Sequence, residues 1–456
     1  MNPPEKLDLG RATRAWEQAL LEVCDLYLVG GTVRDMLLGA SVRSLDEDYL
    51  AAGLPLDDLI VRLERFGRVS LAGKSFGVIK FTPQSERTVD LSLPRTEFST
   101  GPAHRDFSVR FDPYLAVERD LERRDYTINS MALHLKHHVL VDPLGGRADL
   151  DGRLLRVNRR DSFLEDPLRI LRGVQFMARF DLGVEDETLA LMRRDRGGIE
   201  TVSPERVRDE LNKMLLLGEK PSRGFILMHD VGILRSVLPE LEDTYGEEQN
   251  EYHPDDIFMH SLKSCDRAPA ELEIRWSALL HDLGKRDMKQ TVDGRVVFYR
   301  HEERSAHIAD ALLERLRFPH DFRKKVVSLI EHHMFNITEE WSDAAVRRFI
   351  ARVGKENVDD LLALREADGL SRGDAGVIGQ NRDIRNRITR ILESDAAFKI
   401  KDLAISGGDI MRVLGIQEGP EVGAILKALF DAVLETPECN TREKLISLVE
   451  KMGRKR

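Results

Sequence analysis

The first 150 residues alternate between short apolar runs and segments with helical spacing. The runs 26–29, 77–81 and 88–93 are apolar or β-branched and are bounded by glycine, proline or charge, which is typical of strands. Residues 34–38 and 57–66 carry apolar positions at helical spacing. We therefore expect an α/β head at the amino end of the chain.

From Ser162 onward the apolar positions follow helical spacing almost throughout, which predicts a long helical body. Prolines punctuate this body at positions that are typical of helix boundaries, and the acidic, polar stretch near residue 245 is typical of a hinge. We expect four parts, namely a head over 1–150, a helical neck over 151–245, a histidine-rich helical domain over 246–370 and a helical tail over 371–456.

Composition narrows the class of protein. A chain of 456 residues with 42% hydrophobic and 32% charged residues has ample core for two to four domains and is neither disordered nor collagenous. No run of eighteen apolar residues and no signal-peptide pattern is present, so we expect no membrane association. The three cysteines lack metal-site spacing and favour a reducing cytoplasm. The net charge of −10 implies that any nucleic acid is held by a local basic region.

Paired glycines follow the first predicted strand and open a helix. Gly30 and Gly31 let backbone amides approach an anion, and Arg34, one turn later, could pair with a phosphate. A plain strand-to-helix turn has the same local pattern. The motif becomes informative only together with the acidic residues that follow it.

Three carboxylates are candidates for a metal site. If residues 46–48 form a strand, Asp46 and Asp48 point to one face and Glu47 to the other, because strand side chains alternate. Asp90 lies in a later apolar strand, where a charge is costly unless it faces a cation. Carboxylate oxygens and phosphates are ligands that Mg²⁺ prefers, so the pattern indicates two-metal nucleotidyl transfer, although a solvated acidic loop would explain Asp46 and Asp48 alone.

Five ordered motifs resemble the class II CCA-adding tRNA nucleotidyltransferase and bacterial poly(A) polymerase family, a branch of the polymerase-β-like nucleotidyltransferases. The resemblance rests on Gly30-Gly31-x-x-Arg34-Asp35 with Asp46-x-Asp48, Arg123-Arg124-Asp125-Tyr126-Thr127-Ile128-Asn129, Asp142-Pro143-Leu144-Gly145-Gly146, Glu165-Asp166-Pro167-Leu168-Arg169-x-x-Arg172, and Pro204-Glu205-Arg206-Val207. It implies a polymerase-β-like α/β nucleotidyltransferase head, an all-helical neck, an all-helical HD domain and a helical tail.

The resemblance also implies roles for individual residues. Asp46 and Asp48 would bind Mg²⁺, and Asp90 would help to deprotonate the RNA 3′-hydroxyl. The nucleotide would be bound by Gly30, Gly31, Arg34, Arg124, Asp125, Asp166, Arg169 and Arg172. Asp166 and Arg169 would hydrogen-bond the base edge, which favours C and A because both carry an exocyclic amino group. Residues 166, 169 and 172 recur at helical spacing and so are expected on one helix face. Gln175 stands where relatives often have a nucleotide-facing arginine, which affects nucleotide affinity and base preference.

The polar, glycine-containing segment from Arg95 to Arg119 resembles the flexible loop of this family, which is implicated in the switch from C to A addition. Its composition also fits an ordinary surface loop.

A second constellation lies in the histidine-rich region. His260, His281, Asp282 and Asp368 resemble the H…HD…D pattern of HD phosphohydrolases, with His301 and His333 as possible further ligands. Imidazole and carboxylate suit a divalent transition metal or Mg²⁺. In this family the domain resembles a phosphatase or a 2′,3′-cyclic phosphodiesterase acting on RNA ends.

The sequence therefore predicts an enzyme that adds C, A or both from CTP and ATP to the 3′ end of tRNA. A poly(A) polymerase of the same family is the first alternative. An HD phosphohydrolase whose head only binds nucleotide, and a regulator without turnover, are the others. The sequence leaves open which nucleotides are added, which metal the HD site prefers and the oligomeric state.

Overall fold

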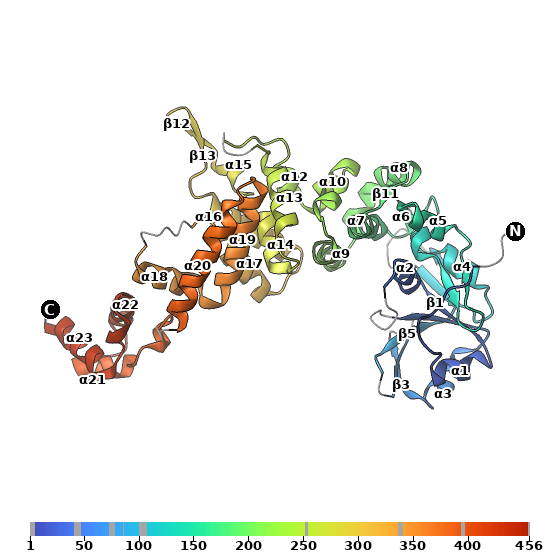
Figure 1. Cartoon of the computed structure of the whole chain (residues 1–456), viewed down its shortest axis with the longest axis horizontal. Coiled ribbons are helices and arrows are strands. Elements are labelled where there is room, and N and C mark those ends of the chain that lie inside the picture. The colour runs from blue at the N-terminus through green and yellow to red at the C-terminus, as the bar shows by residue number, and fades with distance from the viewer. Residues whose placement is uncertain are drawn as a thin grey trace. The chain divides into compact units, whose positions relative to one another are not determined.

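A computed structural model describes residues 5–40, 47–72, 78–84, 86–99, 107–250, 254–335, 341–393 and 397–454 (Figure 1). The contacts within the chain divide it into two units, Met1–Val237 and Leu238–Arg456. The division falls close to the predicted hinge near residue 245. The finer division into four parts stays a prediction.

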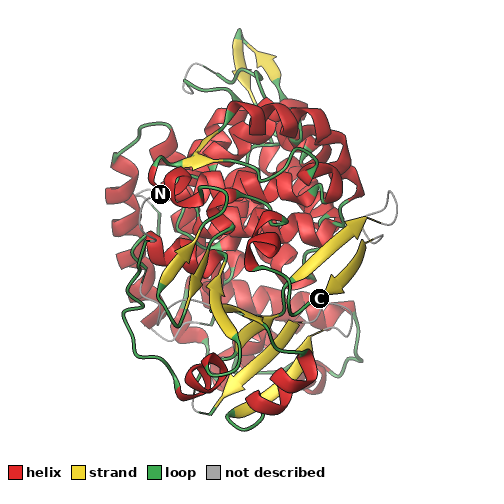
Figure 2. Ribbon diagram, turned by 90° about the vertical axis from the view of Figure 1, so that its right-hand side faces the viewer, coloured by secondary structure: helices red, strands yellow, loops and turns green. Residues whose placement is uncertain are grey.

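The first unit is built on a seven-stranded mixed sheet, whose strands are yellow in Figure 2. Its strand order is β3-β4-β5-β2-β1-β8-β9. Only the pairing of β2 with β5 is parallel among the pairings described for this sheet. The strands are β1 (Asp25–Val29), β2 (Asp48–Ala52), β3 (Gly67–Ala72), β4 (Val78–Pro83), β5 (Val89–Ser92), β8 (Ala132–His134) and β9 (Val139–Val141). This mixed sheet confirms the predicted α/β head.

Helices cover the sheet because its strands bury apolar side chains on both faces. Trp16 of α1 packs edge-on against Tyr49 of β2 and Phe81 of β4. On another part of the sheet, Leu121 of α4 lies in a cluster with Leu50. The helical elements of this region are α1 (Ala15–Leu21), α2 (Gly31–Leu37), α3 (Leu56–Leu63), α4 (Val117–Glu122), η2 (Thr127–Asn129) and α5 (Gly146–Asp151).

The segment from Arg95 to Arg119 was expected to be a loop, and this expectation was wrong. It contains β6 (Arg95–Ser99) and β7 (Phe107–Phe111), which pair antiparallel, and it ends inside α4. Apolar and polar residues alternate in β7 but not in β6, so only one of the two strands has a periodic signal in the sequence. Residues 100–106 lie outside the described ranges.

The remainder of the first unit is helical apart from two short parallel strands. Its elements are β10 (Leu154–Leu155), α6 (Ser162–Glu165), α7 (Leu168–Phe180), β11 (Gly183–Val184), α8 (Asp186–Asp195), η3 (Arg196–Thr201), α9 (Pro204–Leu217), α10 (Ser222–Val231) and α11 (Leu234–Val237). Close packing in this region requires glycine at position 173, because an added Cβ would lie 2.0 Å from the Tyr126 hydroxyl.

In its described ranges, the second unit is helical except for a hairpin of β12 (Gln290–Val292) and β13 (Arg295–Val297), which the sequence pattern did not predict (Figures 1 and 2). Its other elements are α12 (Pro239–Glu242), α13 (Ile257–Arg267), α14 (Leu272–Leu280), α15 (Lys285–Met288), α16 (His301–Arg315), α17 (His320–His332), α18 (Asp343–Val353), η4 (Lys355–Asn357), α19 (Val358–Ser371), α20 (Gly376–Glu393), η5 (Ile400–Asp402), α21 (Gly407–Leu414), α22 (Pro420–Glu435), η6 (Pro437–Cys439) and α23 (Arg442–Arg454).

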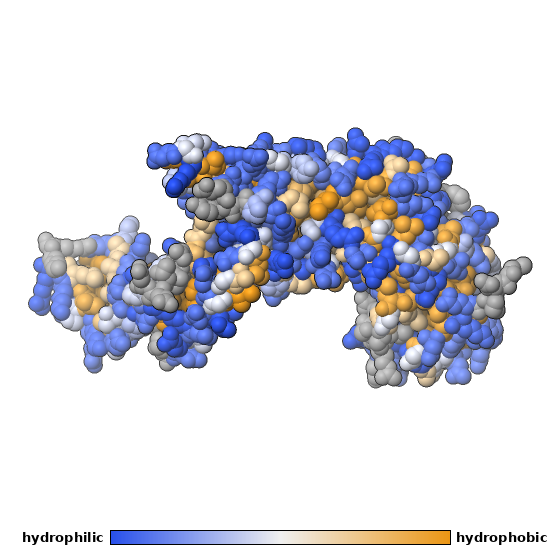
Figure 3. All heavy atoms as spheres, turned by 45° about the horizontal axis from the view of Figure 1, so that its top comes forward, coloured by the Kyte–Doolittle hydropathy of each residue, from blue (hydrophilic) through white to orange (hydrophobic). Residues whose placement is uncertain are grey.

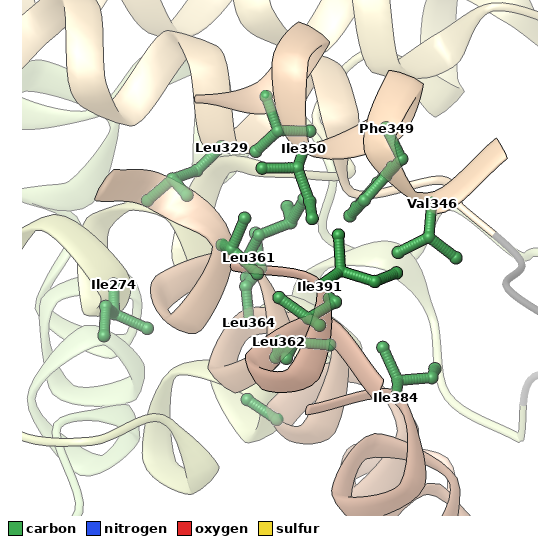
Figure 4. Close-up of a cluster of buried hydrophobic side chains, with 14 of the residues drawn as sticks. Ile274, Leu329, Val346, Phe349, Ile350, Leu361, Leu362, Leu364, Ile384 and Ile391 are labelled. Atoms are coloured by element: carbon green, nitrogen blue, oxygen red, sulfur yellow. The ribbon is translucent and has the colours of Figure 1, made fainter. Parts of the chain in front are cut away.

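Two apolar clusters stabilise the second unit. The first joins α14, α17, α18, α19 and α20, and Figure 4 shows Ile350, Leu361 and Ile391 converging in it. The second lies among α21, α22 and α23 around Ile410, Leu429 and Leu445. The face of the chain in Figure 3 is mostly hydrophilic, with hydrophobic side chains interspersed. Within the described ranges, no helix combines the length and the apolarity needed to cross a bilayer.

Candidate active site

The glycine turn between β1 and α2 holds two parts of the head together. Gly30 has a positive φ of 64°, which favours glycine, and an added Cβ there would lie 2.6 Å from Nη1 of Arg124. The amide of Asp48 donates to Oγ1 of Thr32 at 3.0 Å. The turn thus leaves room for an arginine and fixes the start of β2.

Two of the three predicted carboxylates meet across parallel strands. Asp48 is the first residue of β2 and lies opposite Asp90 of β5 in the register. Lys80 of the neighbouring strand donates to Oδ1 of Asp90 at 2.9 Å, so a cation already neutralises this charge. Asp46 lies outside the described residues. The carboxylate donor set at Asp48 and Asp90 fits a hard divalent cation.

A cavity of about 510 Å³ collects the predicted nucleotide-binding residues. The eight residues and Asp48 all contribute to its lining, although they come from α2, β2, the residues after α4, and the region of α6 and α7. These residues are Gly30, Gly31, Arg34, Asp48, Arg124, Asp125, Asp166, Arg169 and Arg172. The structure therefore places residues more than 140 positions apart in sequence around one space.

Ion pairs arrange the charged side chains of this cavity. Asp125 is buried and accepts from Nε of Arg172 at 2.7 Å. Burial acts to raise the pKa of the Asp125 carboxyl, but Arg172 and a hydrogen bond from Asn129 outweigh it and lower the pKa. Arg34 is also buried, donates to Oδ1 of Asn129 at 2.6 Å, and lies over the ring of Phe180. These charges are held in place by protein groups.

The base-recognition candidates differ in position from the sequence expectation. Asp166 precedes α7 and has an extended backbone, so it does not share a helical face with Arg169 and Arg172. Proline at position 167 explains the difference, because it disfavours a helical residue before it. Asp166 accepts from the amide of Leu168 at 3.2 Å and from Nη2 of Arg206 at 3.0 Å.

Several residues of the cavity were missed at the sequence level. Arg206, Glu210 and Lys213 of α9 line it, as do Asn129 and Arg179. A signal for the first three was present, because their spacing of four and three residues places them on one helix face after the motif at Pro204. The motif at Pro204 could thus have been extended along α9 to include Glu210 and Lys213.

Three buried donors in the lining make no hydrogen bond within the described part of the chain. They are Nε of Arg124, Nε2 of Gln175 and Nη1 of Arg206. A buried polar atom without a partner is costly, and its usual explanation is a ligand or solvent. Donors without acceptors, beside several arginines, suit a ligand rich in acceptor atoms, such as a nucleoside triphosphate.

The second unit contains the predicted His/Asp cluster. Nε2 of His260 lies 3.2 Å from Oδ2 of Asp282 and 3.1 Å from Oδ1 of Asp368. Nε2 of His281 lies 3.2 Å from Asp282. His260, His281 and Asp282 form one possible metal-binding group, and Asp282, His301 and His333 form another. The six candidate ligands are thus brought together from α13, α16, α19 and the ends of α14 and α17.

The electrostatics of this cluster are those of a metal site. Burial acts to lower the pKa of His281, but Asp282 and Asp368 outweigh it and raise the pKa to about 10. Burial and the neighbouring His281 lower the pKa of His333 to about 3. Nε2 of His281 and Nε2 of His301 are buried, and they lie 3.2 Å and 3.3 Å from carboxylate oxygens of Asp282. Several imidazole nitrogens that converge on a buried carboxylate fit a divalent metal.

A cavity of about 360 Å³ opens beside the His/Asp cluster. Lys285, Arg300 and Arg372 contribute cationic groups to its lining, and Phe298 and Tyr299 contribute aromatic rings. Cationic side chains beside a metal site suit a phosphate-containing substrate.

Family models and related proteins match most of the chain. Residues 26–156 match the poly A polymerase head domain, 181–244 a probable RNA and SrmB-binding site of polymerase A, and 297–449 a putative tRNA nucleotidyltransferase domain 2. The Multifunctional CCA protein of Acidovorax sp. (strain JS42) is 36% identical over 419 residues, covering 88% of this chain and 94% of that protein. The Multifunctional CCA protein of Burkholderia multivorans is 34% identical over 432 residues, covering 91% and 99%.

The fold is similar to solved structures over nearly the whole chain. The CCA-adding enzyme of Bacillus stearothermophilus in complex with CTP has a TM-score of 0.70 at 22% identity, covering 97% of this chain and 99% of that one. The Thermotoga maritima CCA-adding enzyme complexed with tRNA has a TM-score of 0.58 at 19% identity, covering 97% of each chain.

Proposed function

Because the chain belongs to the class II family of CCA-adding tRNA nucleotidyltransferases and bacterial poly(A) polymerases, we propose that its first unit adds C and A from CTP and ATP to the 3′ end of tRNA. The observation that carries the proposal is the single cavity in which Asp48 meets the eight predicted nucleotide-binding residues. Catalysis in this family is metal-dependent.

The carboxylates would carry the reactive chemistry, and Asp48 is the described one that lines the cavity. Asp46 and Asp48 would hold Mg²⁺, which when bound supplies charge neutralisation for the triphosphate and lowers the pKa of the attacking hydroxyl. Asp90 lies opposite Asp48 in the register and would take up the proton of the RNA 3′-hydroxyl, a step that requires its ion pair with Lys80 to open. Arg124 lines the same cavity and would orient the phosphates.

The opposite end of the cavity selects the base. Asp166 accepts from the exocyclic amino group of C or A, and Arg169 donates to the ring acceptors. Arg206 donates to Oδ2 of Asp166 at 3.0 Å, which helps to fix the orientation of its carboxylate. A carboxylate in this position disfavours the carbonyl groups of U and G, which explains discrimination without an RNA template.

The second unit supports a second activity. We propose that the His/Asp cluster binds a divalent transition metal or Mg²⁺ and hydrolyses phosphate esters at RNA ends. The cationic lining of the adjacent cavity supports a phosphate substrate. We place both activities in the cytoplasm, because Cys24, Cys265 and Cys439 are free thiols.

Nucleotide addition to three tRNA substrates tests the proposal. The substrates end at the discriminator base, at C and at CC, and each is incubated with CTP, ATP or both. We expect stepwise addition that stops at CCA. Asp48→Ala is expected to abolish it while hydrolysis by the second unit persists.

Other products would point to the alternatives. Long A tails made from ATP alone would identify a poly(A) polymerase. Hydrolysis without any nucleotide addition by the unaltered protein would identify a phosphohydrolase with a nucleotide-binding head.

A further inference from the structure

A buried charge lies directly behind the carboxylates of the candidate active site. Glu47 immediately precedes Asp48, yet Asp48 is exposed and lines the nucleotide cavity, whereas Glu47 is only 5% exposed. Strand alternation accounts for the opposite directions of the two side chains. A buried carboxylate is costly unless it is paired, so the groups around Glu47 determine what it does.

Two arginines from the segment before α1 hold Glu47. Nη2 of Arg11 donates to Oε1 of Glu47 at 3.0 Å, and Nη1 of Arg14 donates to Oε2. The same two guanidinium groups donate to the hydroxyl of Tyr49, at 3.0 Å from Arg11 and 2.9 Å from Arg14. Tyr49 is two residues after Glu47 and therefore points to the same side of β2.

Glu17 completes this network from the other side. It accepts from the Tyr49 hydroxyl at 2.6 Å and from both Nη atoms of Arg11. Burial acts to raise the pKa of Glu17, but hydrogen bonds from Arg11 and Tyr49 outweigh it and lower the pKa. Two arginines thus face two carboxylates and one hydroxyl, and their charges balance. We call Arg11, Arg14, Glu17, Glu47 and Tyr49 the rear network.

The rear network is connected to the reacting carboxylates through the backbone. The carbonyl of Glu47 accepts from the amide of Asp90 at 3.4 Å, and the amide of Asp48 donates to Thr32 of the glycine turn. A rotation or slip at Glu47 would therefore move Asp48 and Asp90 together. Hydrogen-bonded groups behind metal-binding side chains commonly orient them in this way.

We propose that Glu47 is a positioning residue for nucleotidyl transfer: the rear network fixes the start of β2 so that Asp48 and Asp90 face the nucleotide with the geometry that a divalent cation requires. This inference rests on the proposed function of the first unit. The charge of Glu47 is essential to it, because an uncharged side chain would not hold two guanidinium groups.

Comparison of Glu47→Gln with Glu86→Gln tests the inference. Glu86 pairs with Nε of the same Arg14 at 2.8 Å, but it lies at the surface, so its variant removes an ion pair from the same arginine without touching β2 at Asp48. CTP affinity is measured by calorimetry in EDTA and in Mg²⁺, kcat and KM are measured for CMP addition, and the melting temperature is recorded.

For Glu47→Gln we expect a kcat lower by about ten- to a hundredfold, with the KM for tRNA unchanged. Its CTP affinity in EDTA should equal that of the unaltered protein, whereas the gain in affinity caused by Mg²⁺ should be lost. Glu86→Gln should behave as the unaltered protein does. The inference would be overturned if Mg²⁺ still increased the CTP affinity of Glu47→Gln and if this variant lost activity only in proportion to its folded fraction.

Tyr49→Phe provides a second test if Glu47→Gln does not fold. This variant keeps the buried ring and removes only the hydroxyl, so we expect a smaller loss of the Mg²⁺ gain in the same direction. An unchanged Mg²⁺ gain together with an unchanged kcat would overturn the inference. If the unaltered protein binds CTP more tightly with Mg²⁺ but adds no nucleotide, the proposed function fails while this comparison still decides the role of Glu47.

Discussion

Asp166 shows how a single side chain acquires a function through its surroundings. Alone it is a surface carboxylate at a helix start, but the contact with Arg206 and the neighbouring Arg169 direct it into the nucleotide cavity. The proposed base selection then depends on whether the base presents an amino donor or a carbonyl acceptor to the Asp166 carboxylate.

Asp166→Asn is expected to relax base selection. The amide of asparagine can donate to the carbonyl of U, whereas the carboxylate only accepts. The ratio of UMP to CMP incorporation should rise by about tenfold or more, since one well-placed base contact contributes about 1–3 kcal/mol of discrimination. Single-nucleotide incorporation with each of the four triphosphates measures this ratio. An unchanged ratio would show that Asp166 does not take part in base recognition.

Gln175→Leu is expected to weaken nucleotide binding. Gln175 is buried, and its Nε2 atom makes no hydrogen bond within the described part of the chain. If this atom donates to the nucleotide, its removal should raise the KM for CTP and ATP by about two- to tenfold. The melting temperature should stay equal or rise, because an unsatisfied buried donor is removed from the free protein. An unchanged KM would show that Gln175 does not contact the nucleotide.

At the level of elements, local sequence patterns predicted several individual strands and helices of the head. The strand at Leu26, the helix after Gly31 and the strand at Val89 were all predicted, because burial on a sheet or helix imposes a period that can be seen in a short window. The clustering of His281 with Asp368 was predicted only through the resemblance of the whole pattern to a family.

Features that depend on distant pairing were not predicted. The hairpin of β6 and β7 was interpreted as a loop, and the contact between Arg11 and Glu47 joins residues 36 positions apart. The pairing of β6 with β7 and the ion pair leave no local signal in the sequence, because register and ion pairing are decided by the assembled fold. The buried donors of Arg124 and Arg206 that make no hydrogen bond in the described part of the chain were likewise not predictable from local sequence.

Gly173→Ala tests the packing of α7 that positions Arg169 and Arg172. The added methyl group would meet the Tyr126 hydroxyl at 2.0 Å and Met192 at 2.8 Å, so we expect a loss of about 1–3 kcal/mol of stability. Gly379→Ala in α20 is the control, since no atom lies within 4 Å of its Cβ position, and it should be neutral or stabilising by about 1 kcal/mol. Calorimetric melting of both variants makes the comparison. Equal melting temperatures would contradict the close packing.

At the scale of the whole molecule, the chain carries two chemical sites in two separate units. Among the residues that the structure describes, the lining of the nucleotide cavity comes from Met1–Val237 and the His/Asp cluster from Leu238–Arg456. Each candidate site has its own buried charges and its own lining residues. The two activities should therefore be separable by single substitutions.

His281→Ala is expected to abolish phosphate-ester hydrolysis and metal binding by the second unit, because His281 belongs to the proposed metal-binding group. CMP addition to tRNA should stay within twofold of that of the unaltered protein. Metal content after purification and both activities are measured on the same preparation. Loss of CMP addition in this variant, with the first unit still folded, would show that the two sites are not independent.

The central claim is that the carboxylates beside the glycine turn hold a divalent cation against the triphosphate of CTP. The most direct measurement is a crystal structure with CTP and Mn²⁺, in which anomalous scattering locates the cation. We predict a peak in contact with Asp48, with the triphosphate near Gly30 and the base edge at Asp166. CTP bound elsewhere, or a cavity that binds CTP with no cation near Asp48, would contradict the account.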